Sequence, residues 1–423
     1  MSTTQPSPMT PDAAAAALLD PRTFSDPALA FACGDVLREE SPFHHIEHPE
    51  YEPLTIVSRF DDVYEIEIHD AEFVNGTDPV LAKRHRIQAR AEAGQEFRTL
   101  ITMDEPEHGS HRALLQPWFS PRVLRALQPR IEELARQAVD RMMALGGECD
   151  FATEVAIPLP LQVILSTIGL PDSDYDQMLR LTQQLFSPDD PDVGRGDSTE
   201  EITAVLAGFF DYFSDLVADR TTNPCDDLAT TIATGQIDGC PITQFEKFGH
   251  YTVLATAGHD TTSSALAGGL EALLAHPEQL ERLRAHPELI SNAADEIIRW
   301  VTPVKHFMRQ VAEPYEISGH RFEPGDRVYM SYVAANRDPR AIEDPYRFDV
   351  GRTGSRHLAF GFGVHYCLGA NLARMEVRAV LAELLPRLRH IELAGPVEWA
   401  HSTVVSGPKH IPVRYELTPA LQV

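Results

Sequence analysis

One cysteine near the C-terminus lies in an unusual loop, Phe360-Gly361-Phe362-Gly363-Val364-His365-Tyr366-Cys367-Leu368-Gly369. The segment that follows, from Ala370 to Leu385, has the pattern of a helix. Backbone N–H groups at a helix N-terminus stabilise a thiolate, and glycines let the backbone approach the sulfur and a flat group closely. A buried structural cysteine is the ordinary alternative. Three glycines and a histidine at fixed offsets favour a thiolate that ligates haem iron instead.

The spacing F-G-x-G-x-H-x-C-x-G resembles the haem-binding loop of the cytochrome P450 family. The resemblance implies that Cys367 ligates the iron of haem b, with Phe360, Gly361 and Gly369 shaping the loop around it. It also implies the mainly α fold of that family, in which a large helical region is joined to a smaller β-rich region.

A second motif, Ala257-Gly258-His259-Asp260-Thr261-Thr262, lies inside a helix predicted at about 243–275. Glycine costs about 1 kcal/mol in a helix relative to alanine, and Asp and Thr compete for backbone groups, so this turn should be distorted. A simple helix kink is the alternative. The motif resembles the oxygen-binding motif of the P450 family. The resemblance implies that Thr261 hydrogen-bonds bound O2, that Asp260 relays protons through water, and that Gly258 leaves room for O2.

Glu296 and Arg299 lie three residues apart in a helix predicted at 287–301. Such a pair is usually a surface ion pair. In the P450 family an E-x-x-R pair is instead a buried structural lock, completed by a later arginine. The resemblance implies that Arg347 is this third member and that Arg337 belongs to the same irregular segment.

His108 and Arg112 are four residues apart, so they project from one helix face and offer donors to two carboxylates. A solvated face is the alternative. The resemblance implies that they bind the haem propionates together with His365 and Arg309. His357 is a weaker candidate.

Composition excludes several classes of protein. The net charge of −27, from 36 basic and 63 acidic residues, disfavours nucleic acid and anionic membranes as partners. No apolar run approaches the ~18 residues that span a bilayer. Five scattered cysteines without a CxxC pair fit a reducing cytoplasm. We expect a cytoplasmic protein, with residues 1–20 a disordered lead into a short helix and residues 21–423 a single P450 domain.

The remaining pattern is mostly helical. Leu54 to Val57 reads as a strand, and a helix follows from Phe60. Further helices are predicted at about 106–118, 121–146, 151–169 and 277–285, a small β-sheet at 311–333 and a β-like tail at 403–416. Residues 75–100 and 187–197 are predicted as loops, and whether they close over substrate stays open.

The resemblance implies monooxygenation, in which one atom of O2 enters a C–H bond and the other leaves as water. No flavin or nicotinamide domain is apparent in the sequence, so electrons are expected from an iron–sulfur ferredoxin and its NAD(P)H-dependent reductase. The predicted docking face holds Arg112, Arg340, Arg374 and Arg378.

The expected substrate is apolar and small to mid-sized: a terpenoid, steroid, alkyl or aromatic compound. The residues expected to line its pocket are Val253, Thr256, Ala257, Val304, Phe307, Val404 and Val405. Lys305 and His306 are predicted to face water rather than to anchor a polar group. Two alternatives remain: a peroxide-driven peroxygenase, which would not need Asp260 and Thr261, and a non-enzymatic haem sensor or carrier.

Overall fold

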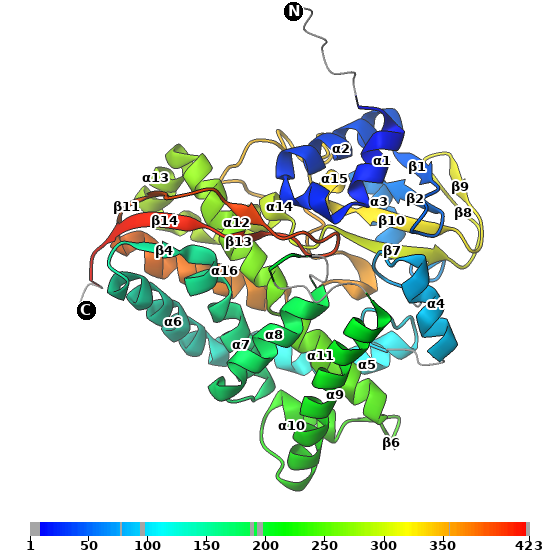
Figure 1. Cartoon of the computed structure of the whole chain (residues 1–423), viewed down its shortest axis with the longest axis horizontal. Helices are drawn as coiled ribbons and strands as arrows, with labels where there is room; N and C mark the ends of the chain where they lie inside the picture. Colours follow the sequence, from blue (N-terminus) through cyan, green and yellow to red (C-terminus); the bar gives the residue numbers. More distant parts are fainter. Residues whose placement is uncertain are drawn as a thin grey trace, which may run out of the picture.

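A computed structural model describes residues 9–76, 78–93, 98–186, 190–192, 198–354 and 356–419. Helices make up most of the molecule, and the largest sheet gathers at one end of it (Figure 1). The predicted mainly α fold, with its smaller β-rich region, is confirmed.

The helices follow the predicted pattern closely. Helix α13 has the predicted bounds, and the segment after the cysteine loop is helical as expected. The α-helices are α1 Pro11–Leu18, α2 Pro27–Glu40, α3 Phe60–Ile68, α4 Arg84–Ala93, α5 Glu107–Leu115, α6 Pro121–Ala144, α7 Pro158–Ile168, α8 Tyr175–Phe186, α9 Thr199–Thr222, α10 Leu228–Ala233, α11 Gln244–Ala257, α12 Asp260–Ala275, α13 Pro277–Ala285, α14 Ile290–Val301, α15 Tyr332–Ala335 and α16 Ala370–Arg387.

The main sheet has the strand order β1-β2-β10-β7-β3, with β10 parallel to β2 and antiparallel to β7. A second sheet has the order β11-β14-β4. The strands are β1 Phe43–Ile46, β2 Leu54–Val57, β3 Phe73–Val74, β4 Glu148–Asp150, β5 Gln236–Ile237, β6 Cys240–Pro241, β7 His306–Val311, β8 Tyr315–Ile317, β9 His320–Phe322, β10 Arg327–Ser331, β11 Leu388–Leu393, β12 Glu398–Trp399, β13 Pro408–His410 and β14 Pro412–Leu417.

The N-terminal segment is more ordered than predicted. Helix α1 begins after Thr10, whose hydroxyl caps it, and it buries Ala14, Ala15 and Leu18 against α2. The short helix is therefore confirmed, but disorder is wrong for residues 11–18, because an apolar face packs there. Residues 1–8 lie outside the described part of the chain.

One of the two predicted loops contains a helix, and the other is described only in part. Helix α4 lies within 75–100, where charged helix formers give no apolar period to read. Of 187–197, only residues 190–192 are described. Asp190 is buried there, and Lys409 Nζ donates to its carboxylate at 3.1 Å. Closure of either segment over substrate stays a prediction.

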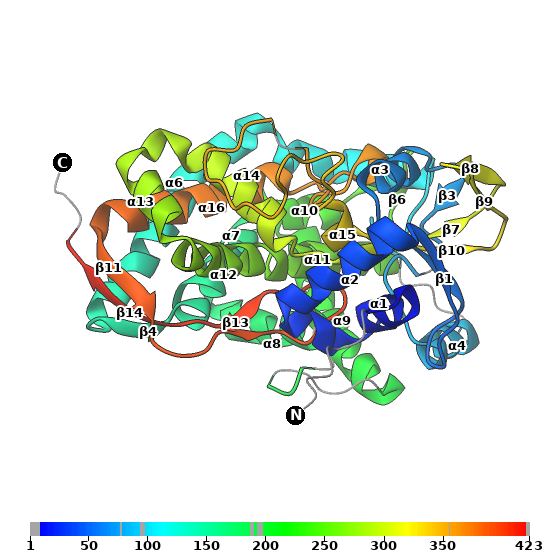
Figure 2. The same cartoon turned by 90° about the horizontal axis from the view of Figure 1, so that it is seen from above.

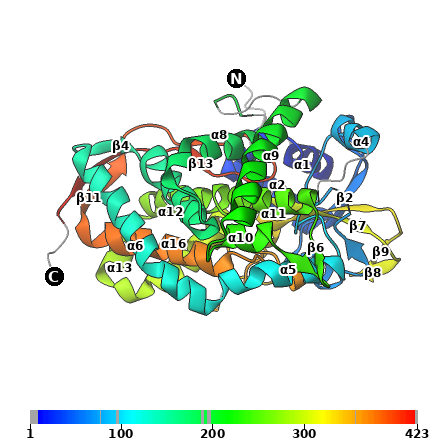
Figure 3. The same ribbon diagram turned by 90° about the horizontal axis from the view of Figure 1, so that it is seen from below.

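Helices α11 and α12 run one after the other through the middle of the molecule (Figure 2). Helix α11 contacts α7, α8, α9 and α10, which lie on the side seen in Figure 3. Helix α12 packs against α14 and α16. Side chains of the α11–α12 junction therefore lie inside the fold. No helix in the described part of the chain combines the length and apolarity needed to cross a membrane.

Candidate active site

The cysteine loop is folded tightly against α3. Cys367 N–H donates to Phe360 O at 2.9 Å, and α16 begins three residues after the sulfur. Gly363 has a φ of 65°, and a Cβ built there would lie 2.1 Å from the backbone oxygen of Glu67. Only glycine fits this position, because both the backbone conformation and the close contact exclude a side chain.

The groups around Cys367 shift the pKa of its thiol in opposite directions. Burial raises the pKa of the thiol, and the Gly369 N–H, Arg112 and Arg374 lower it less than burial raises it. The predicted contribution of the helix terminus is present, since the Gly369 N–H lowers the pKa of the thiol, but burial outweighs it. A bound metal cation supplies what is missing, because ligation deprotonates a thiol outright.

A cluster of donors lies beside this loop. His108 is buried, and its Nδ1 donates to Glu105 Oε1 at 2.9 Å. Its Nε2 is buried and has no hydrogen-bond partner among the described residues. The rings of His108 and His365 have centroids 4.1 Å apart, and His365 Nε2 accepts a hydrogen bond from Asn75 Nδ2 at 2.6 Å.

Two guanidinium groups, Arg112 and Arg309, and two carboxyl groups, Glu67 and Glu105, lie in this cluster. The pKa of His365 falls to about 2, first because of burial and then because Arg309, His108 and Arg112 lie near. Arg112 Nη2 donates to Tyr366 O at 2.7 Å, and Arg309 Nη2 donates to Glu67 Oε2 at 3.2 Å. The four predicted propionate contacts are thus brought together, and the guanidinium groups of Arg112 and Arg309 among them fit a ligand with two carboxylates.

The central helix is broken where the sequence predicted a distortion. The single helix expected at 243–275 ends at Ala257 and restarts at Asp260. Thr261 Oγ1 donates to Ala257 O at 2.8 Å, a side-chain bond that competes with the helical ladder. Distortion at this motif is therefore confirmed.

One face of the broken helix carries more exposed surface than the rest of it. Ala257 is exposed, and Val253 and Thr261, four residues before and after it, are half-buried. Their neighbours Ala255 and Thr262 are buried. Thr256, predicted to line the pocket, is also buried, and its hydroxyl donates to Thr252 O at 2.7 Å.

Asp260, next to Thr261 on α12, has an incompletely satisfied carboxylate. Its side chain is 18% exposed, and His259 Nδ1 lies 3.1 Å from its Oδ1. Its Oδ2 has no hydrogen-bond partner among the described residues. Asp260 and Thr261 therefore present an acid and an alcohol at one end of α12.

The predicted lock is present with a different third arginine. Arg299 donates from Nε and Nη2 to Glu296, both at 2.8 Å, and both side chains are fully buried. Arg352 Nε also donates to Glu296 Oε2, at 3.1 Å. Arg347 is 60% exposed and lies beside Asp349, so its prediction as the third member is wrong. The turn after Pro345 points Arg347 outward and returns the chain at Arg352.

Arg337 lies in the same segment, as predicted. It is buried, and its guanidinium donates to the backbone oxygens of Arg299 and Trp300. The end of α14 is therefore fixed to the irregular segment that precedes the cysteine loop.

Two segments of the predicted pocket lie side by side. Val304 and Val405 form an isolated bridge, and Lys305 N–H donates to Val404 O at 2.8 Å. Phe307 is half-buried on β7. The structure thus brings Val304 and Val405 together from distant parts of the sequence.

Lys305 and His306 do not face water, which corrects the prediction. Lys305 Nζ donates to the oxygens of Val301 and Thr302 at 3.0 and 2.9 Å, and burial lowers its pKa to about 7. Leu81 N–H donates to His306 Nε2 at 2.8 Å, and burial lowers the pKa of His306 to about 4. The chain around 403–405 packs over the beginning of strand β7 and excludes water from both side chains. The alternating pattern of a strand cannot predict such a contact with a distant segment.

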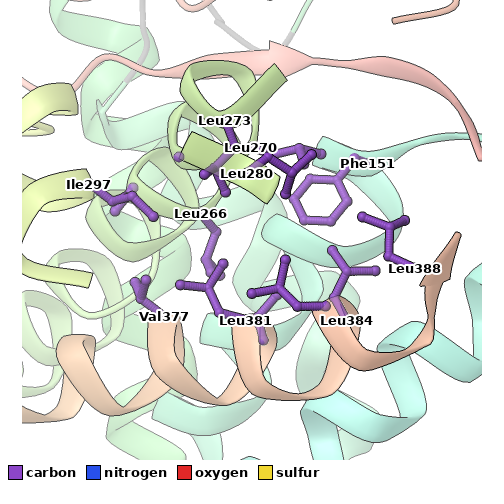
Figure 4. A pocket seen from close by; sticks show the side chains of 14 residues that line it. Phe151, Leu266, Leu270, Leu273, Leu280, Ile297, Val377, Leu381, Leu384 and Leu388 are labelled. Carbon is purple, nitrogen blue, oxygen red and sulfur yellow. The ribbon is translucent and has the colours of Figure 1, made fainter. Parts of the chain in front are cut away.

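An apolar cavity lies elsewhere, between α12, α14 and α16 (Figure 4). Leu266, Leu270, Ile297, Leu381 and Leu384 are among its lining residues. None of the predicted pocket residues lines it, and its lining side chains are all apolar or glycine. It is a gap in core packing rather than a site for chemistry.

The arginines of the predicted docking face are mostly engaged. Arg374 donates to Asp295 Oδ1 at 2.6 Å and lies over the Phe360 ring at 4.5 Å. Arg340 pairs with Glu39 and Asp338. Arg378 has a buried Nε with no hydrogen-bond partner among the described residues. Docking of a partner here stays a prediction.

Sequence reasoning missed several residues that hold the site. Asn75 orients His365, Glu67 pairs with Arg309 and accepts a hydrogen bond from Tyr332, and His259 contacts Asp260. Their partners lie far off in the sequence or within the motif, so no periodic pattern marks them. His259 alone carried a signal, since it stands within the Ala257–Thr262 motif.

Comparison with known proteins decides the family. The model of the family "Cytochrome P450" matches residues 283–410. Cytochrome P450-terp from a Pseudomonas species is 34% identical over 418 residues, 96% of this chain and 98% of that protein. The chain belongs to the cytochrome P450 family.

Other P450s show the same breadth of similarity. A steroid C26-monooxygenase from Mycolicibacterium smegmatis is 30% identical over 387 residues, covering 90% of this chain and 89% of that protein. The crystal structure of CYP108D1 from Novosphingobium aromaticivorans superposes with a TM-score of 0.89 at 38% identity. The superposition covers 97% of this chain and all of that one. Family membership makes the chain an oxidoreductase of the monooxygenase type and implies a haem-thiolate cofactor.

Proposed function

We propose that this P450 hydroxylates a small to mid-sized apolar compound, with O2 as co-substrate and haem b as cofactor. The observation that carries the proposal is the pairing of two features. Cys367 lies in its glycine loop beside a donor cluster, and Asp260 and Thr261 lie together where the central helix is broken.

Different residues around the loop would bind different parts of the cofactor. Cys367 would ligate the iron, and His108, Arg112, Arg309 and His365 would bind the two propionates. Haem ligated by a thiolate supplies O2 activation, because the sulfur donates electron density that favours O–O cleavage.

Asp260 and Thr261 would accept and pass on the protons that the reaction needs. The Thr261 hydroxyl already donates to Ala257 O, so its oxygen is left as an acceptor until that bond is exchanged. Asp260 has one buried carboxylate oxygen without a hydrogen-bond partner among the described residues, and proton transfer would begin when a water molecule reaches it. A peroxygenase would need neither group, so their presence favours the O2-dependent reaction.

The substrate would meet an apolar lining. Val253, Ala257, Val304 and Phe307 all carry exposed or half-buried surface and no charge. The relatives named P450-terp and steroid C26-monooxygenase favour a terpenoid or a steroid over other apolar compounds. Buried Lys305 is unlike an anchor, since its ammonium is already occupied by two backbone oxygens.

Electrons would come from a ferredoxin and its NAD(P)H-dependent reductase, docking near Arg112 and Arg374. We place the protein in the cytoplasm, because all five cysteines are unpaired, as a reducing compartment requires. A charge reversal at Arg112 that leaves ferredoxin affinity at low salt unchanged would refute this docking face.

Two measurements test the proposal. Purified protein reduced under carbon monoxide should show the red-shifted band of a thiolate-ligated haem, and Cys367→Ser should abolish it. Cys225→Ser, a change at an exposed free cysteine, is the matched control and should retain the band. A wild-type protein without haem or without this band would refute the proposed ligation.

Substrate class is then tested by titration with limonene, progesterone, dodecanoic acid and naphthalene, following the low-spin to high-spin shift. Product formation is compared with spinach ferredoxin, its reductase and NADPH, and separately with hydrogen peroxide. Product with peroxide only would favour a peroxygenase. No shift with any of the four would favour a sensor or carrier.

A further inference from the structure

His259 is a buried histidine for which the family-based reading has no role. It occupies the break between α11 and α12, and its side chain is fully buried. Its Nδ1 lies 3.1 Å from Asp260 Oδ1 and 3.2 Å from the hydroxyl oxygen of Thr182 on α8. One nitrogen thus contacts both the acid of the central helix and a neighbouring helix.

The hydrogen-bond pattern fixes where the proton of His259 resides. The Thr182 hydroxyl donates to Leu179 O at 3.0 Å, so toward His259 it offers only a lone pair. Asp260 Oδ1 is also an acceptor. With the Thr182 hydroxyl donating to Leu179 O, we assign the hydrogen of His259 to Nδ1, where it faces both oxygens.

The other nitrogen supports the same assignment. His259 Nε2 is buried and has no hydrogen-bond partner among the described residues. A lone pair left unpaired there costs less than an unpaired N–H of a charged ring. A hydrogen on Nδ1 leaves this lone pair at Nε2.

We propose that His259 is a positioning residue for Asp260. In this role Nδ1–H faces Oδ1 at 3.1 Å, so a proton taken up by Asp260 resides on Oδ2, the buried oxygen without a hydrogen-bond partner among the described residues. The shared contact with Thr182 also ties the orientation of Asp260 to helix α8. This inference rests on the proposed function of Asp260 in proton delivery.

The link to α8 has a consequence for substrate binding. Thr182 is buried and lies in the last two turns of α8, which packs against both α11 and α12. A shift of α8 away from the junction leaves the whole Nδ1–H for Asp260. Thr182→Val mimics this state, because it removes the competing acceptor while keeping the shape of the side chain.

The kinetic test compares His259→Leu, which removes the donor, with His259→Asn, whose amide N–H replaces it. The probe is whichever of limonene, progesterone, dodecanoic acid and naphthalene gives the largest spin shift. Product is measured with the NADPH-driven partners in H2O and D2O, and with hydrogen peroxide, which brings its own protons. Haem content and the carbonyl band normalise for folded protein.

We expect His259→Leu to lose about tenfold in NADPH-driven product and to gain a larger solvent isotope effect, while peroxide-driven product stays within about twofold. His259→Asn should retain most of the NADPH-driven rate. Asp260→Asn should be at least as impaired, and the double variant His259→Leu/Asp260→Asn no worse than Asp260→Asn alone.

Several outcomes would overturn the inference. Equal losses with NADPH and with peroxide would make His259 a packing residue only. An unimpaired His259→Leu beside an impaired Asp260→Asn would refute the positioning role alone, whereas an unimpaired Asp260→Asn would refute the proposed role of the acid. A second measurement needs no substrate: nitrogen NMR of histidine-labelled ferrous carbonyl protein, assigned with His259→Asn, should show Nδ1 protonated. A hydrogen on Nε2 would refute the geometry.

Discussion

Arg352, rather than Arg347, should stabilise the folded protein through the buried Glu296–Arg299 pair. Arg352 donates to Glu296 Oε2 at 3.1 Å and to the backbone oxygens of Glu343, Asp344 and Arg347 at 2.7, 3.1 and 2.7 Å. Arg352 therefore links the irregular segment that contains Glu343, Asp344 and Arg347 to the fully buried carboxylate of Glu296.

The size of the effect follows from these contacts. Arg352→Ala removes one charge-assisted hydrogen bond to a buried carboxylate, about 1.5–3 kcal/mol. Water replaces most of the three carbonyl contacts, because they lie at the surface, so they add about 1 kcal/mol together. Glu296 keeps Arg299 as a partner, so the loss stays below the roughly 5 kcal/mol of a fully broken buried pair. We expect Arg352→Ala to cost about 3 kcal/mol.

Arg347→Ala is the matched control. Its guanidinium is 60% exposed and lies 3.5 Å from Asp349, so its removal should cost less than about 1 kcal/mol. Urea titration of both holoproteins, followed by far-ultraviolet circular dichroism and by haem absorbance, gives the two changes in the free energy of unfolding. Equal losses, or a larger loss for Arg347→Ala, would refute the assignment of the lock.

Three further predictions concern the cysteine loop, the donor cluster and a buried lysine. Gly363→Ala should reduce haem binding far more than Gly354→Ala, because both have φ near 65° but only Gly363 lies against Glu67; equal carbonyl spectra would contradict this. His108→Phe should loosen haem, measured as faster transfer to apomyoglobin, whereas an unchanged rate would remove His108 from the propionate contacts. Burial lowers the pKa of Lys305 to about 7, so the unfolded chain binds its proton more tightly than the folded one. This residue should therefore raise stability as pH rises from about 7 toward about 10, and Lys305→Met should flatten that part of the profile in urea titrations.

Much of the site was predictable because its functional residues lie in short sequence motifs. The glycine spacing around Cys367, the Ala257–Thr262 motif and the E-x-x-R pair each lie within one turn or one loop, where neighbours in sequence are neighbours in space. Local rules of helix propensity were enough to predict a distortion at the Ala257–Thr262 motif, though not that the helix ends at Ala257 and restarts at Asp260.

Contacts between distant segments were decided only by the tertiary structure. Three such contacts join residues that share no sequence pattern. Arg352 contacts Glu296, the chain around 403–405 packs over Lys305 and His306, and Thr182 of α8 contacts His259. The charge state of Cys367 belongs to the same group, since desolvation by the whole fold outweighs the helix terminus beside it. The sequence by itself determined which chemistry the chain carries and on which helices and loops. Burial and long-range packing decided which arginine completes the lock and which groups stay neutral, because both depend on the neighbours that folding brings together.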